Sequence, residues 1–452
     1  MLRFGHSWPE GRFLQRMFLK RIQLGLIHVA VTITLLPINS TLNRIMIKEL
    51  AISATLVAVL ASLPYVFSPI QVAIGSFSDR HPLLGWRRTP YILLGLLLCV
   101  IGVISAPQIA FLLASNFWLG VLVGITVFGA WGMGFNFATV SYFSLATEIS
   151  GEKGRSRSVA VMFFMMIVSI ITTSLILSHL VASYDPAALV SAFWLVGLAA
   201  LGIGLIGILG LEPRYRQNAP QGDQHTWGQM TQAILRNPQA ARFFVYLMLL
   251  LTAILGQDIL LEPFAAEAFG LSVQATTRIT SVWGTFFLIA LVLGGVLEKR
   301  VSKFVQARLG AWLGIAAFAL IVLSSSSISP NVFYGGVILL GLATGLSTVS
   351  NLSLMLDMTT VGNVGLFIGA WGMASALARL CGNLLSGILR DSATQLTGDA
   401  VLGYGIVFSI EILLLVVSLF ILRQVDVSVF QNTASQQIGF SERAALANEG
   451  GV

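Results

Sequence analysis

Gly75-Ser76-Phe77-Ser78-Asp79-Arg80-His81-Pro82-Leu83-Leu84-Gly85-Trp86-Arg87-Arg88 is a short charged turn between two apolar runs, residues 51–74 and 89–105. Because both runs are long enough to approach the thickness of a bilayer, a turn this compact predicts a membrane protein with many helices. A weaker copy, Gly294-Gly295-Val296-Leu297-Glu298-Lys299-Arg300, recurs in the second half of the chain. The two copies predict an internal repeat.

The composition supports this interpretation. Hydrophobic residues make up 56% of the 452 residues, and charged residues make up only 10%. A soluble domain carries roughly 25% charged residues, so the deficit excludes an ordinary soluble enzyme. The length suits about twelve helices of about 20 residues with their loops.

Twelve apolar spans are predicted, in two groups of six. They cover residues 22–42, 51–76, 89–111, 117–146, 158–182, 187–210, 241–262, 274–297, 309–327, 332–357, 362–389 and 402–422. The predicted organisation is an N-terminal segment (1–21), a six-helix half (22–210), a central loop (211–240), a second six-helix half (241–422) and a polar tail (423–452).

The basic residues predict the orientation. Most of the 26 Lys and Arg residues fall in the N-terminal segment, in the loops 77–88, 147–157, 211–242 and 298–308, and in the tail. The opposite side holds Arg44, Lys48, Arg278 and Arg390. By the positive-inside rule, both termini and the central loop are cytoplasmic. The net charge of +7 therefore reflects topology and does not indicate a nucleic-acid partner.

A second match ties the halves together. Thr139-Val140-Ser141-x-x-Ser144-Leu145-x-x-Glu148 aligns with Thr348-Val349-Ser350-x-x-Ser353-Leu354-x-x-Asp357, in the fourth span of each half. Parallel six-span repeats of this kind are typical of the major facilitator architecture. The predicted fold is an all-α membrane protein with twelve transmembrane helices in two pseudo-symmetric six-helix halves.

The charged turn is also similar to the G-x-x-x-D-R-x-G-R-R loop of the major facilitator superfamily, with four residues inserted before Gly85. Physically it could act as a cytoplasmic latch, in which Asp79 caps a helix N-terminus or pairs with Arg155 or Arg157. Alternatively, the arginines serve only as a topology signal. The predicted latch comprises Gly75, Asp79, Arg80, Arg87, Arg88, Glu148, Arg155, Arg157, Glu298, Arg300 and Asp357.

Three strings carry a narrower resemblance: Leu42-Asn43-Arg44-Ile45-Met46, Gly85-Trp86-Arg87-Arg88-Thr89-Pro90-Tyr91 and Trp131-Gly132-Met133-Gly134. They resemble the PucC/LhaA family, bacteriochlorophyll-delivery-type members of the superfamily. The resemblance covers about residues 10–425.

That resemblance implies a factor that assembles light-harvesting or related chlorophyll-protein complexes. Such a factor would bind chlorophyll or bacteriochlorophyll transiently and would contact light-harvesting apoproteins and pigment-synthesis enzymes. It implies a multi-pass protein of a bacterial inner membrane, photosynthetic or thylakoid.

Ionisable residues within spans are costly and are therefore functional candidates. Asp258 and Glu262 lie four residues apart, which predicts one face of the seventh span and allows a proton site made of two carboxylates. Arg379 in the eleventh span needs an acidic partner, and Glu411 in the last span is one candidate.

Three residues are candidates for contact with a pigment. His28 lies in the first span, and a neutral imidazole can ligate the magnesium of a chlorophyll. The alternative is a histidine hydrogen-bonded to a neighbouring helix. Trp131 and Trp371 each stand in a Trp-Gly-Met string and could line a flat apolar cleft; packing beside the glycine is the alternative.

Motifs for catalysis are not apparent. The sequence shows no phosphate-binding loop, no metal cluster with usable spacing and no Ser/His/Asp arrangement, so we expect neither an enzyme nor a bound metal. A proton-coupled secondary transporter of a small solute is the alternative function. A pigment-synthesis subunit is a weaker third possibility.

Overall fold

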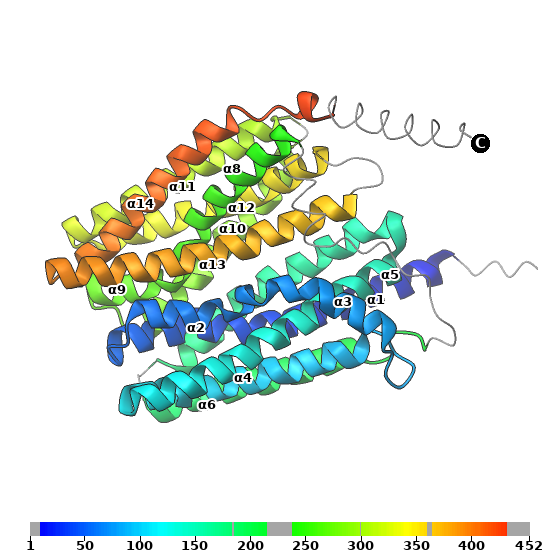
Figure 1. The fold of residues 1–452 in the computed structure, drawn as a ribbon, viewed down its shortest axis with the longest axis horizontal. Helices are drawn as coiled ribbons and strands as arrows, with labels where there is room; N and C mark the ends of the chain where they lie inside the picture. The colour runs from blue at the N-terminus through cyan, green and yellow to red at the C-terminus, as the bar shows by residue number, and fades with distance from the viewer. Residues whose placement is uncertain (1–9, 183–184, 215–236, 299, 359–363, 432–452) are drawn as a thin grey trace, which may run out of the picture. The chain divides into compact units, whose positions relative to one another are not determined.

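The computed structural model describes residues 10–182, 185–214, 237–298, 300–358 and 364–431. These residues are almost entirely helical (Figure 1). Among them, 11 helices are long and apolar enough to cross a membrane, and the apolar helix over residues 54–70 is shorter. The prediction of an all-α, multi-pass membrane protein is confirmed.

The helices follow the predicted spans closely. In the first part of the chain they are α1 (Glu10–Pro37), α2 (Ala54–Val66), α3 (Gln71–Arg80), α4 (Thr89–Ser115), α5 (Phe117–Leu180) and α6 (Pro186–Ile208). In the second part they are α8 (Pro238–Gly256), α9 (Leu261–Phe269), α10 (Val273–Leu297), α11 (Lys303–Ser327), α12 (Pro330–Asp357), α13 (Val364–Thr397) and α14 (Ala400–Leu422). Short π-helical turns, Ile38–Leu42 and Ile45–Glu49, extend the first span beyond Pro37.

The second predicted span is broken. A 3-10 turn at Ser68–Ile70 separates α2 from α3, and Pro69 within it lacks the N–H that a continuous α-helix would need. The 13 residues of α2 reach about 20 Å, which is less than the apolar thickness of a bilayer. The fourth and fifth spans run into each other as α5, where Gly151 (φ 59°) makes the turn between them.

The seventh span is interrupted as well. α8 ends at Gly256, a 3-10 turn covers Gln257–Ile259, and α9 begins at Leu261. The prediction that Asp258 and Glu262 share one face of a continuous α-helix is therefore wrong, because the helix changes its winding between them. Glu262 is buried in the first turn of α9, whereas Asp258 is partly exposed.

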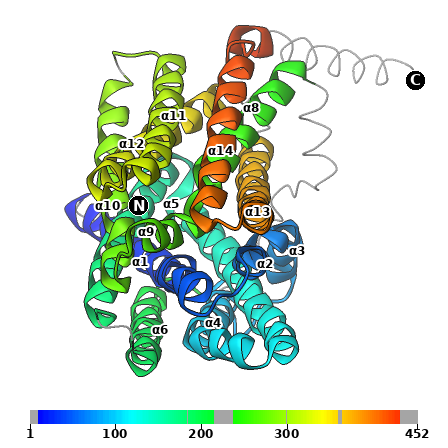
Figure 2. The ribbon, with the colours of Figure 1, turned by 90° about the vertical axis from the view of Figure 1, so that its left-hand side faces the viewer.

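The helices cluster into two compact units. Unit 1 comprises residues 1–52, 70–224 and 271–284, and unit 2 comprises residues 53–69, 225–270 and 285–452. In unit 1, α5 packs against α1 and α4, and α6 packs against α1 and α4. In unit 2, α13 packs against α2, α8 and α14. Helices α8, α13 and α14 can be followed side by side in Figures 1 and 2.

Close helix contacts depend on glycine at a few positions. A Cβ on Gly95 of α4 would lie 2.5 Å from the backbone of α5 at Gly134 and Ala138. A Cβ on Gly382 of α13 would lie 2.7 Å from the Cα of Gly256 in α8. Small residues let membrane helices approach until their backbones touch. The second contact positions the site described below.

Candidate functional site

One carboxylate organises the charged turn of unit 1. Glu212, which follows α6, accepts hydrogen bonds from the backbone N–H groups of Arg87 (2.8 Å) and Thr89 (2.7 Å) and from that of Arg88 (3.1 Å). These are the unsatisfied donors at the start of α4, where the helix dipole also favours a negative charge. Glu212 thus caps α4.

Sequence reasoning missed this role, because it assigned helix capping to Asp79, whose side chain lies outside the described residues. The available signal was the acid in Glu212-Pro213, immediately after the sixth span and on the same predicted side as the basic turn.

Arg88 is the buried centre of the same turn. Its Nε and Nη2 donate to Oε1 of Glu148 at 3.1 and 3.0 Å, and its Nη1 donates to the hydroxyl of Ser78 at 2.7 Å. Arg157, by contrast, is exposed. The side chain of Arg155 lies outside the described residues. Arg88 therefore joins α3, α4 and α5 through one guanidinium.

Unit 2 repeats this arrangement with a lysine. Nζ of Lys303 lies 2.7 Å from Asp357 Oδ1 and 3.6 Å from Glu298 Oε1. In each half, an acid at the end of the fourth span thus holds a base at the start of the third span. Arg300, the predicted base, is exposed. The internal repeat extends from the sequence to the ion pairs, although the partner in this half is Lys303.

His28 lies inside unit 1 in an aromatic cage. Its ring stacks on Tyr142 at 5.2 Å, and Phe143 and Phe163 meet it edge-on at 5.6 and 5.4 Å. The residue is 5% exposed, and its Nδ1 has no hydrogen-bond partner among the described residues. A magnesium-bound macrocycle would have to displace these aromatic rings to reach it.

Trp131, the candidate whose side chain the structure describes, does not line an open cleft. Trp131 is fully buried, and a Cβ on Gly102 would lie 2.5 Å from the Cβ of Trp131. This close contact fits packing beside a glycine. The side chain of Trp371 lies outside the described residues.

The candidate site with exposed polar chemistry lies in unit 2. Nη1 of Arg379 in α13 lies 2.9 Å from Oδ2 of Asp258, and Nε2 of Gln257 donates to Oδ1 of Asp258 at 2.9 Å. The guanidinium carbon of Arg379 lies 5.8 Å from the ring centre of Tyr65 in α2. The side chains of Arg379 and Asp258 are 35% and 30% exposed. We call Tyr65, Gln257, Asp258 and Arg379 the Arg379 centre.

The backbone contact between Gly256 and Gly382 positions this centre. Asp258 follows Gly256 by two residues in the 3-10 turn, and Arg379 precedes Gly382 by three, almost one helical turn. Because α8 and α13 touch at the glycines, the two charged side chains can meet without leaving their helices. On its other side, Asn383 Nδ2 donates to the Ser62 hydroxyl of α2 at 3.1 Å.

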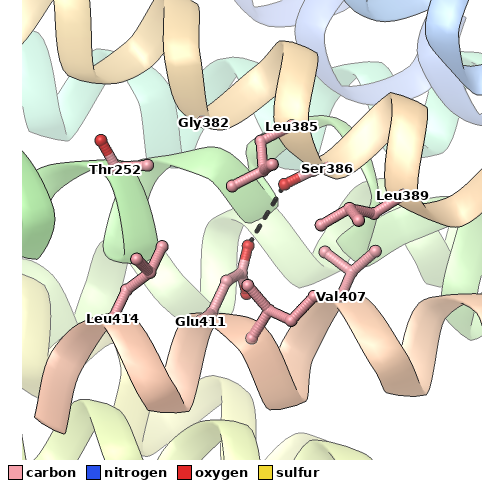
Figure 3. Close-up of a pocket in the computed structure, with 9 residues that line it drawn as sticks. Thr252, Gly382, Leu385, Ser386, Leu389, Val407, Glu411 and Leu414 are labelled. Carbon is pink, nitrogen blue, oxygen red and sulfur yellow. Dashed lines mark hydrogen bonds between the residues drawn. The ribbon is translucent and has the colours of Figure 1, made fainter. Parts of the chain in front are cut away.

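Glu411 lies in a separate, narrow hollow. The hydroxyl of Ser386 donates to its Oε1 at 3.4 Å, and its Oε2 has no hydrogen-bond partner among the described residues. Figure 3 shows Glu411 and Ser386 facing each other across this hollow, which is lined by Thr252, Gly382, Leu385, Ser386, Leu389, Val407, Ile410, Glu411 and Leu414. The suggested pairing of Arg379 with Glu411 is therefore wrong, since Asp258 takes that place.

A further charged network ties α2 to the C-terminal part of α13. Asp391 accepts hydrogen bonds from the backbone N–H groups of Ala54 (3.1 Å) and Thr55 (2.7 Å). Its carboxylate thus helps to cap the N-terminus of α2. Arg390 bridges Asp391 and Glu267 at 3.0 Å each. Sequence reasoning used Arg390 only for topology; the adjacent Arg390-Asp391 pair at a span end was the missed signal.

Comparison with known proteins shows the family to which the chain belongs. The PUCC protein family matches residues 41–430, which is most of the chain. The chain belongs to the PUCC protein family. PUCC relatives include Protein PucC of Rhodovulum sulfidophilum, 30% identical over 408 residues that cover 86% of this chain and 88% of the relative.

Other relatives match over similar lengths. Protein PucC of Rhodobacter capsulatus is 28% identical over 416 residues, covering 88% of this chain and 90% of the relative. A Rhodobacter capsulatus protein named Bacteriochlorophyll synthase 44.5 kDa chain is 26% identical over 411 residues, covering 89% and 94%.

Solved structures show that this PUCC protein has a transporter fold. The nucleoside transporter NupG superposes with a TM-score of 0.70 at 15% identity, covering 90% of this chain and 98% of NupG. A bacterial homologue of the lysosomal transporter Spinster gives 0.71 at 13% identity, covering 92% and 98%. The predicted major facilitator fold is confirmed.

Proposed function

We propose that this protein is a membrane assembly factor or carrier. It delivers chlorophyll or bacteriochlorophyll to light-harvesting or related complexes, or chaperones their assembly, and it catalyses no reaction itself. The observation that carries the proposal is membership of the PUCC family over residues 41–430, together with similarity to a chain named for bacteriochlorophyll synthase. Its partners are then the lipid bilayer, chlorophyll-binding apoproteins and pigment-synthesis enzymes.

The outer apolar surface supports such a role. Phe164 and Trp118 of α5 and Trp194 of α6 are large and exposed, at 50%, 79% and 47%. In a membrane, such side chains meet lipid, hydrophobic pigments or the helices of other membrane proteins. The closed cage around His28 favours contact at this surface over ligation deep in unit 1.

The proposed location follows from the charges. By the positive-inside rule, the proposed orientation has both termini, the capped start of α4 and the Lys303 cluster on the cytoplasmic side. Membership of the PUCC family supports a bacterial photosynthetic membrane as the proposed location. Pigment would then be handed over on the side where these ion pairs lie, or within the bilayer.

A proton-coupled transporter is the second candidate, and the Arg379 centre favours it. An arginine and an aspartate paired within spans and about one-third exposed are the kind of group that marks ion and substrate paths in membrane proteins. The superposed structures named as transporters support the fold that this function needs.

The deciding experiment is gentle purification from the native photosynthetic membrane. The absorption spectrum and the co-purifying polypeptides are measured together. Stoichiometric chlorophyll with antenna polypeptides supports delivery or assembly, and active pigment synthesis in the same preparation would favour a synthesis subunit. A colourless preparation without partners contradicts the proposal and favours solute transport.

Two variants refine that experiment. His28→Ala tests the enclosed imidazole, and His179→Ala, at an exposed position near the end of α5, is the matched control. If His28 ligates pigment, only the first variant loses chlorophyll. Equal spectra from both variants would assign His28 to packing.

A further inference from the structure

We propose that the Arg379 centre binds an oxyanion carried by an apolar molecule, and that Asp258 takes up a proton as the oxyanion replaces it on Arg379. The inference deepens the proposed function by naming a ligand group and the residue that recognises it. It rests on that function only in the choice of pigment as the first probe.

Arg379 has the donors for such a ligand. The ion pair to Asp258 uses Nη1, while a guanidinium carries five N–H donors in a planar fork that matches carboxylate and phosphate oxygens. The Arg379 side chain as a whole is 35% exposed, and it also interacts with the hydroxyl of Tyr65, so a second acceptor would use the donors that Asp258 and Tyr65 leave. The aromatic ring of Tyr65, 5.8 Å from the guanidinium carbon, adds a flat face beside the charge.

Charge balance explains why a proton must move. The Arg379–Asp258 pair is neutral as a whole, and adding an anion to it would leave one uncompensated negative charge within a span. When the oxyanion takes the place of Asp258 on Arg379, one ion pair breaks and one forms. An O–H bond then forms on Asp258, so the site remains neutral.

The structure provides a place for this proton. Oδ1 of Asp258 accepts the Gln257 amide, so Oδ2, the oxygen that leaves Arg379, is the one to be protonated. The Oε1 atom of Gln257 is buried and has no hydrogen-bond donor among the described residues. Because this oxygen belongs to the same carboxamide that donates to Asp258, we infer that it accepts the hydrogen bond of the protonated Oδ2.

Among the described residues around Asp258, no cation other than Arg379 competes for the ligand. Within the part of the chain that the structure describes, the charged or titratable groups that interact with Asp258 from neighbouring elements are Arg379 of α13, Tyr65 of α2 and Glu411 of α14. Glu262 is the first acid of α9. Once Arg379 has turned to a ligand, Asp258 loses the cation that stabilises its ionised form, and a carboxyl without that partner favours the protonated state.

The place of the centre selects the ligand class. Arg379 and Asp258 belong to predicted spans, and the side chain next to Tyr65, Val66, is 45% exposed. A free inorganic anion would lose its hydration there without compensation. When the anionic group belongs to an apolar molecule, burial of the apolar part in the bilayer offsets that cost. A pigment free acid and a lipid acid share this chemistry, and the test must distinguish them.

The test uses the full-length protein in detergent and matched pairs of probes. Chlorophyllide a is compared with its methyl ester, and oleate with methyl oleate, by calorimetry in buffers of different ionisation enthalpy. We expect the acid to bind about 10- to 100-fold more tightly than its ester, as charge-assisted hydrogen bonds do. We also expect uptake of about one proton per acid bound and none per ester.

Three variants connect this result to the residues. Arg379→Gln removes the preference for the acid. Asp258→Asn retains the preference, binds the acid more tightly because Arg379 has no competing partner, and takes up no proton. Arg423→Gln, an exposed arginine just after α14, changes neither property. Asp258→Asn keeps the test decisive even if Arg379→Gln fails to fold.

The outcomes separate the two proposals. Equal binding of chlorophyllide and its ester overturns the oxyanion site and leaves pigment delivery standing. An acid preference that survives in Arg379→Gln, or proton uptake that survives in Asp258→Asn, also overturns the inference. Selective binding of oleate with no pigment binding supports the site, assigns it to a lipid acid and counts against pigment delivery. Binding of neither acid overturns the inference.

Discussion

At the scale of single residues, two side chains of opposite charge in unit 1, Glu212 and Arg88, have different structural roles. Glu212 satisfies backbone donors at the start of α4, while Arg88 links side chains of three helices. Neither role depends on long-range charge alone. Both depend on hydrogen bonds made by a buried side chain, Glu212 or Arg88, and a lost partner of a buried group is costly.

Removing the carboxylate of Glu212 should destabilise the protein. Glu212→Ala leaves three backbone donors at the start of α4 unsatisfied, and we expect a loss of about 1–3 kcal/mol. Glu212→Gln keeps an acceptor oxygen without the charge and should lose less. Thermal unfolding in detergent measures both. Wild-type stability in the alanine variant would contradict the cap.

Replacing Arg88 by lysine should also be costly. Arg88→Lys keeps the charge but cannot reach Glu148 and Ser78 together with a planar fork, so we expect a loss of about 2–3 kcal/mol. The control is Arg157→Lys at an exposed position, which should change stability by less than about 0.5 kcal/mol. If both substitutions have equal effects, Arg88 serves topology alone.

At the scale of helices, local breaks and backbone contacts determine which polar groups meet. The 3-10 turn at Gln257–Ile259 presents Asp258, and the glycine contact between α8 and α13 brings Arg379 to it. The broken second span has a similar effect, because α2 packs on α13 and brings Tyr65 and Ser62 to the same region of unit 2. Irregular backbone within spans is where membrane proteins commonly place polar sites.

A methyl group at the glycine contact should separate these helices. Gly382→Ala places a Cβ 2.7 Å from the Cα of Gly256, so we expect a loss of about 1–3 kcal/mol from overpacking. Any binding that depends on the Arg379 centre should weaken with it. Gly405→Ala in α14 is the matched control, since nothing lies within 4 Å of its added Cβ. A neutral Gly382→Ala would show that the contact tolerates movement.

At the scale of the whole molecule, the two units do not simply follow the two halves of the sequence. α2 belongs to unit 2, although α1 and α3 belong to unit 1. The first part of α10 belongs to unit 1, where the Ser174 hydroxyl donates to the backbone oxygen of Thr277 at 2.7 Å. The boundary of the sequence repeat therefore does not coincide with the boundary between the two packing units.

The orientation of the chain can be tested with single cysteines. In a background with Cys381→Ser, which removes the exposed native thiol and retains the buried Cys99, Leu84→Cys and Leu396→Cys introduce thiols at positions 85% and 88% exposed. With cytoplasmic termini, an impermeant maleimide should label position 396 in intact spheroplasts and position 84 only in inverted vesicles. The reverse pattern would invert the topology.

Much of the architecture could be predicted from sequence because it depends on local chemistry. The spans follow from continuous apolar runs that only a bilayer or a core can accommodate. The fold class follows from two six-span halves with the same charged turn and the same Thr-Val-Ser string. Each half even retains the ion pair at the end of its fourth span, although Lys303 replaces the expected Arg300.

The sequence by itself determined the membrane location, the position of most spans and their repeat, since hydrophobicity and spacing are properties of neighbouring residues. Only the tertiary structure decided that Arg379 pairs with Asp258 and not with Glu411, and that Glu212 caps α4. These partners are separated by more than 100 positions in the sequence. Whether they meet depends on backbone contacts and helix breaks, because a hydrogen bond requires its two atoms within about 3 Å.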